Sequence, residues 1–74
     1  MKAVAVFATT SAAMAVQDAA DRGAVAGHMI PVPASLSAGC GLAWCADDGD
    51  AQALRRALER EGLAFAGIHV LDLG

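Results

Sequence analysis

The stretch that decides the fold is AVAVFATTSAAMAV at residues 3–16, which changes from a strand pattern to a helix pattern. Residues 2–8 are apolar and include two valines and a phenylalanine, which is typical of a buried central strand. Thr9 or Thr10 can then accept a hydrogen bond from the first free amides of a helix. Because apolar residues recur at helical spacing after this cap, we predict a helix over residues 12–22.

The same order of elements returns in the second half of the chain. Residues 42–46, LAWCA, alternate between two faces as a strand does, and DDGD at residues 47–50 is a turn that offers several helix caps. A helix with one apolar stripe is predicted over residues 51–61. Stretches rich in valine, isoleucine and leucine predict further strands over residues 24–32 and 63–73. Two prolines close the former strand, which indicates an edge strand because proline cannot donate a ladder hydrogen bond.

The predicted order is β-α-β-β-α-β within a single domain over residues 1–74. Right-handed crossovers then favour a ferredoxin-like α+β fold, with a four-stranded antiparallel sheet and two helices on one face. The other face is left uncovered, although residues 2–8 direct apolar side chains to both faces. Nineteen residues are alanine, which buries little apolar area. We therefore expect a homodimer, packed sheet to sheet or joined along an edge strand.

Composition and charge argue against several classes of partner. The net charge is −3 and the five basic residues are scattered, so we expect no nucleic-acid partner, because phosphate contacts need clustered Lys and Arg. No apolar run approaches the ~20 residues that span a bilayer, so no membrane partner is expected. The apolar run after Lys2 is short and threonines interrupt it, so we expect a cytoplasmic protein rather than a secreted one. Thiols are kept reduced in that compartment.

The distinctive chemical motif is the loop around Cys40, which has Gly39 and Gly41 on its two sides. Glycine permits positive φ, and successive free amides can form an anion-binding nest. Such a nest would stabilise the thiolate of Cys40, which is the nucleophilic form, and Ser37 could add a hydroxyl donor. Cys40 is therefore the candidate catalytic residue, with Ser37, Gly39 and Gly41 as candidate substrate-binding residues. The alternative is an ordinary buried cysteine between turn glycines.

Cys45 and the two histidines are weaker candidates. The alternation places Cys45 inside a strand, and an extended segment would hold it roughly 16 Å from Cys40, too far for a disulfide within the chain. Cys45 is then a strand residue, or a resolving thiol that acts after rearrangement or across a dimer. A zinc site needs about four converging ligands, and Cys40, Cys45, His28 and His69 lack metal-ligand spacing. We therefore predict neither a metal nor a cofactor.

Taken together, these motifs resemble a small bacterial family catalogued as putative selenium/sulfur carrier protein-like. The resemblance covers nearly the whole chain. It rests on the threonine turn at 9–10, IPVP at 30–33, CGLA at 40–43, the acidic turn at 47–48 and FAGI at 65–68. One departure is Cys45, which stands where the family pattern is variable, so the resemblance implies no role for it.

The resemblance implies that Cys40 carries sulfur or selenium as a persulfide or selenopersulfide. A donor such as a cysteine desulfurase would load it, and an acceptor protein would receive the atom. This implies a carrier protein more than a stand-alone enzyme. A second interpretation is a regulatory module that binds a ligand or protein, in which Cys40 is structural, because fold alone does not set function. Slow alkylation and no retained sulfane sulfur would favour the second interpretation.

Overall fold

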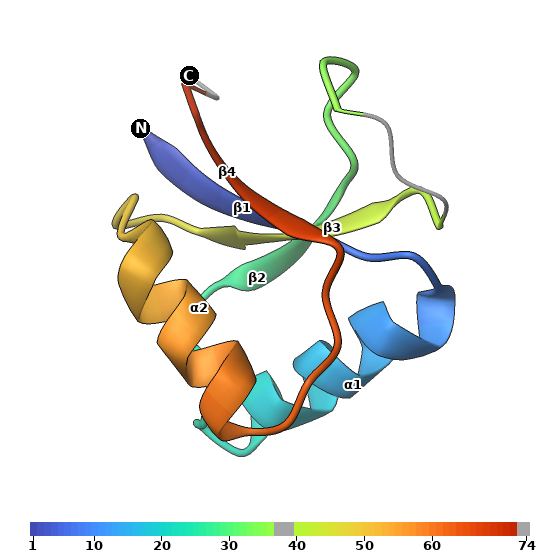
Figure 1. Cartoon of the computed structure of the whole chain (residues 1–74), viewed down its shortest axis with the longest axis vertical. Coiled ribbons are helices and arrows are strands. Elements are labelled where there is room, and N and C mark those ends of the chain that lie inside the picture. The colour runs from blue at the N-terminus through green and yellow to red at the C-terminus, as the bar shows by residue number, and fades with distance from the viewer. Residues whose placement is uncertain (37–39, 73–74) are drawn as a thin grey trace.

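The computed structural model describes residues 1–36 and 40–72, which form one four-stranded sheet and two helices (Figure 1). The elements follow one another as β-α-β-β-α-β, which is the predicted order. Their bounds are β1 Lys2–Val6, α1 Thr10–Asp21, β2 His28–Pro31, β3 Leu42–Ala46, α2 Ala51–Arg60 and β4 Gly67–Leu71.

The strands lie in the order β2-β3-β1-β4, and every neighbouring pair is antiparallel. Each helix therefore connects two strands that are not neighbours, and both helices lie on one face of the sheet (Figure 1). This is the ferredoxin-like α+β arrangement that the sequence predicts. β2, which ends at Pro31, is an edge strand as expected, and β4 is the other edge.

Side-chain oxygens cap the first turn of both helices. Thr9 Oγ1 accepts a hydrogen bond from the backbone amide of Ala12 at 3.1 Å, and Asp50 Oδ1 accepts one from the amide of Ala53 at 3.0 Å. Thr9, and not Thr10, is therefore the cap of α1. Neither of the helices in the described part of the chain has the length and apolar character needed to cross a bilayer.

Three strands are shorter than predicted. The expected strand over 24–32 shrinks to β2, the one over 63–73 shrinks to β4, and the one over 2–8 ends at Val6. Two of the larger apolar residues beyond the strand ends nevertheless contribute to the core: Val25 is buried and Phe65 half-buried, and both pack there from outside any strand. An apolar run indicates that side chains are buried, but it does not show that the residues form a strand. Connecting segments can also contribute side chains to the core.

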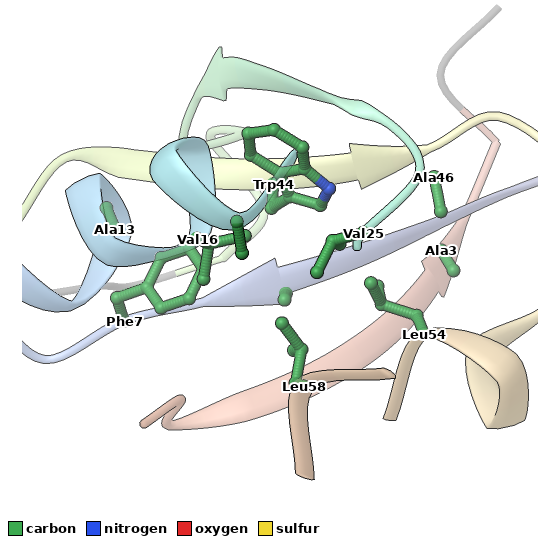
Figure 2. Packing of buried hydrophobic residues seen from close by; sticks show 11 residues of the cluster. Ala3, Phe7, Ala13, Val16, Val25, Trp44, Ala46, Leu54 and Leu58 are labelled. Atoms are coloured by element: carbon green, nitrogen blue, oxygen red, sulfur yellow. The ribbon is translucent and has the colours of Figure 1, made fainter. Parts of the chain in front are cut away.

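The main core lies between the sheet and the helices (Figure 2). Trp44 of β3 and Phe7, just after β1, are its largest fully buried side chains. The Trp44 indole Nε1 donates a hydrogen bond to the carbonyl oxygen of Ala26 at 3.0 Å, so the ring is buried without an unsatisfied donor. Val16 of α1 and Leu58 of α2 belong to the same buried cluster, so both helices pack on this face of the sheet.

The face opposite the helices was expected to be uncovered, and this expectation is wrong for its apolar part. Val4, Val6 and Ala43 are buried within the single chain. The side chains that pack against them belong to β2, to the segment that follows it and to the end of β4: Ile30, Val32, Leu36 and Leu71. The segment after β2 runs on the side of the sheet away from the helices, so the chain covers this face with its own loop (Figure 1).

Candidate functional site

Cys40 lies in the turn directly before β3, in the glycine-flanked loop that the sequence analysis identified as the candidate site. Its side chain is half-buried and packs against the core on the helical side of the sheet. The backbone amide of Leu42 lies 3.4 Å from Cys40 Sγ and can donate to it, and the Leu42 carbonyl oxygen is also 3.4 Å from the sulfur. The Leu42 amide can therefore donate a hydrogen bond to a Cys40 thiolate, and the Leu42 carbonyl oxygen can accept one from a Cys40 thiol.

The turn geometry depends on Gly41, which has φ +75. Its carbonyl oxygen accepts a hydrogen bond from the amide of Val32 at 3.0 Å, which joins the turn to the segment after β2. Gly41 thus has the positive φ that glycine adopts without strain. Ser37 and Gly39, the other two candidate substrate-binding residues, lie outside the described residues.

Cys45 has very different surroundings from Cys40. It lies within β3 and is 2 % exposed, with Val4 of β1 and His28 of β2 as its cross-strand neighbours. Burial raises the pKa of the Cys45 thiol, and the negative charge of Asp47 raises it further. Both effects favour the thiol form, and Cys45 lies within a strand as predicted. Both cysteines are free.

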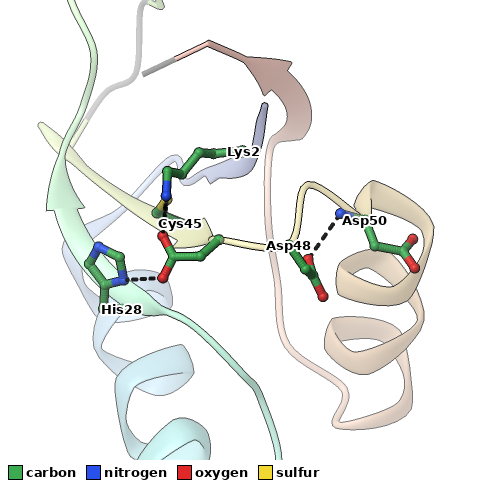
Figure 3. Close-up of polar contacts among 6 residues, drawn as sticks. Lys2, His28, Cys45, Asp48 and Asp50 are labelled. Carbon is green, nitrogen blue, oxygen red and sulfur yellow. Dashed lines mark hydrogen bonds and ion pairs between the residues drawn. The ribbon is translucent and has the colours of Figure 1, made fainter. Parts of the chain in front are cut away.

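A polar cluster surrounds Cys45 at one end of the sheet (Figure 3). Asp47 is its centre: one carboxylate oxygen lies 2.9 Å from Lys2 Nζ and 3.8 Å from Cys45 Sγ, and the other lies 3.4 Å from His28 Nδ1. The hydrogen bond from Lys2 lowers the pKa of the Asp47 carboxyl and raises the pKa of the Lys2 ammonium. The cluster therefore contains a carboxylate, an imidazole, a thiol and an ammonium within contact distance.

The structure brings together some of the four metal-ligand candidates and separates others. His28 and Cys45 meet, and they are joined by Asp47, which the sequence reasoning had treated only as a turn residue. His69 is separated from Cys45 by β1, where it stands opposite Val4. The signal that could have found Asp47 is its spacing, since residues two apart on a strand share a face.

A shallow pocket of about 300 Å³ lies between α2 and the segment that joins α1 to β2. Small side chains such as Ala24 and Ala57 line it, and Arg60 at its rim donates a hydrogen bond to the Ala24 carbonyl oxygen at 3.1 Å. Of the described residues of the Cys40 turn, neither Cys40 nor Gly41 lines this pocket.

The family described as "Putative Se/S carrier protein-like" matches residues 2–70 of the chain. No curated protein and no solved structure matches the chain.

Proposed function

The chain belongs to the putative Se/S carrier protein-like family, and from this premise we propose that Cys40 carries sulfur or selenium as a persulfide or selenopersulfide. The observation that carries the assignment to Cys40 is its position: the residue is half-buried in a turn, and its sulfur lies 3.4 Å from the Leu42 amide. This amide can donate a hydrogen bond to the sulfur in its reactive, ionised form. Cys45 lacks this combination, because it is buried inside a strand.

The loading step is a thiol–persulfide exchange with no net redox change. The Cys40 thiolate attacks the terminal sulfur or selenium atom of a donor persulfide, such as that of a cysteine desulfurase. A bond forms from Cys40 Sγ to the transferred atom, and the bond from that atom to the donor sulfur breaks. The donor thiolate leaves with the electron pair, and an acceptor nucleophile later takes the atom from Cys40 by the same exchange.

A carrier suits these surroundings better than an enzyme that acts alone. Among the described residues, the hydrogen-bond partners of the Cys40 sulfur are the two backbone groups of Leu42. A backbone amide can hold a negative charge but cannot take a proton from a substrate, so acid–base chemistry has to come from the donor or acceptor protein. The role also requires a reduced thiol, which is the normal state in the cytoplasm.

The test is intact-mass analysis after incubation with a cysteine desulfurase and cysteine, or with a selenopersulfide donor. The wild-type chain and Cys45→Ser should each gain the mass of one sulfur or selenium atom, and a reductant should remove it. Cys40→Ser should gain nothing. An adduct that persists in Cys40→Ser, or a wild-type chain that stays unmodified beside a loaded desulfurase, would contradict the proposal and favour a structural Cys40.

A further inference from the structure

We infer that His28, Cys45 and Asp47 form a binding site for a divalent transition-metal ion of the zinc type, with one coordination position open to solvent. The site is separate from the proposed carrier function. Cys40 comes just before β3 and packs on the helical side, whereas Asp47 follows β3 and the cluster lies on the opposite face. Success or failure of one proposal therefore does not decide the other.

The strand register explains why these three side chains converge. His28 of β2 stands directly opposite Cys45 of β3, so the two side chains share a face. Asp47 comes two residues after Cys45, so its side chain returns to that face just beyond the strand. In Figure 3 the side chains of His28, Cys45 and Lys2 point toward one common point at the end of the sheet.

The ligand atoms have nearly the separations that a metal ion requires. Zinc bonds of 2.0–2.3 Å at tetrahedral angles place neighbouring ligand atoms roughly 3.3–3.6 Å apart. His28 Nδ1 lies 3.4 Å from one Asp47 oxygen, and Cys45 Sγ lies 3.8 Å from the other. All three ligand atoms lie within 4.8 Å of one another. Small side-chain rotations would therefore close the site without any movement of the strands.

The donor set selects the class of metal. A thiolate and an imidazole favour zinc and related transition ions, whereas magnesium and calcium prefer oxygen ligands alone. His28 and Asp47 are each more than half exposed, so the ion can enter from solvent and keep a water as a fourth ligand. On binding, a metal–sulfur bond forms, the Cys45 thiol releases its proton to solvent, and the oxidation states do not change.

The Lys2 ammonium occupies a position beside Asp47 where a metal ion would place its positive charge. The ammonium contacts the Asp47 oxygen that also faces Cys45 Sγ, so an ion bound through that oxygen would displace it. Lys2 is therefore a competitor for Asp47, and its removal should make metal binding tighter. A site that used other residues would not respond to Lys2 in this way.

The test is a titration of the reduced, untagged chain with Co²⁺, followed by displacement with Zn²⁺. One equivalent of Co²⁺ should give thiolate-to-cobalt absorption, which Zn²⁺ removes, and either ion should slow alkylation of Cys45. Cys40→Ser should keep these properties, and Cys45→Ser should lose the absorption. His28→Gln should weaken binding at least about tenfold, since even indirect supports of a metal site commonly have that effect.

Lys2→Gln completes the design, because it should tighten binding whereas His28→Gln weakens it. Both residues are at least partly exposed, so these variants should fold, and Trp44 fluorescence checks that they do. The proposal is overturned if Co²⁺ does not bind, if the thiolate absorption depends on Cys40 instead of Cys45, or if neither His28→Gln nor Lys2→Gln changes the affinity.

Discussion

Cys40 and Cys45 are the same residue type in opposite surroundings, and their reactivity should differ accordingly. The half-buried Cys40 has an amide directed at its sulfur, whereas burial and Asp47 raise the pKa of the Cys45 thiol. A raised thiol pKa leaves less thiolate at a given pH, and thiolate is the form that reacts. At pH 7 we expect a small alkylating reagent to label Cys40 at least about tenfold faster than Cys45.

Peptide mapping after a short exposure to the reagent measures both rates in one sample, and the same chain in denaturant is the control. The difference should vanish when the chain is unfolded, because both thiols then meet the same solvent. Preferential labelling of Cys45 in the folded chain would contradict the assignment of Cys40 as the nucleophile.

Gly27, at the entry to β2, should tolerate substitution far less well than Gly23. Gly27 has φ +121, and a Cβ there would meet the Cys45 carbonyl oxygen and, at 2.6 Å, Trp44 Nε1. Gly23 also has positive φ, +79, but a Cβ there would meet open space. Gly27→Ala should therefore lower the free energy of unfolding by about 3 kcal/mol or more, and Gly23→Ala by about 1 kcal/mol.

Urea unfolding monitored by circular dichroism provides both values. Equal losses for the two variants would show that the close approach of Gly27 to β3 does not contribute to stability.

At the scale of the elements, the cap of α1 offers a matched pair of neighbouring threonines. Thr9 Oγ1 accepts the Ala12 amide, whereas Thr10 is already the first helical residue. Thr9→Ala should cost about 1 kcal/mol of unfolding free energy, and Thr10→Ala should cost little. Thermal unfolding of the two variants measures the difference, and a larger loss for Thr10→Ala would mean that the cap has been assigned to the wrong residue.

The order and type of all six elements could be predicted from the sequence, because each helix has an apolar stripe with a cap and a glycine stop, and each strand is an apolar stretch bounded by turn or proline residues. Strand ends could not, since Val25 and Phe65 are drawn into the core from connecting segments by tertiary packing. The Cys40 turn was recognisable from its glycines. The Asp47 cluster was not, because it depends on the register of β2 against β3, which places His28 opposite Cys45.

At the scale of the whole molecule, the chain covers more of itself than its composition indicates. The loop after β2 contributes Val32 and Leu36 to the face away from the helices. Because the chain itself covers the apolar part of this face, there is little reason to expect a dimer packed sheet to sheet. Self-association is therefore still predicted, but only through pairing of exposed edge strands. β2 ends at Pro31, which blunts an edge, whereas β4, GIHVL, contains no proline and no Lys, Arg, Asp or Glu.

We accordingly predict a homodimer joined along β4, in which two antiparallel copies extend the sheet. Val70 on this edge is 45 % exposed, and a lysine there would introduce the kind of charge that blocks pairing of edge strands. Met14 on α1 is similarly exposed, at 49 %, but lies away from the edge, so Met14→Lys is the matched control. In sedimentation at micromolar concentration, wild type and Met14→Lys should be dimers and Val70→Lys a monomer. A wild-type chain that sediments as a monomer and still unfolds cooperatively would show that its single core is sufficient.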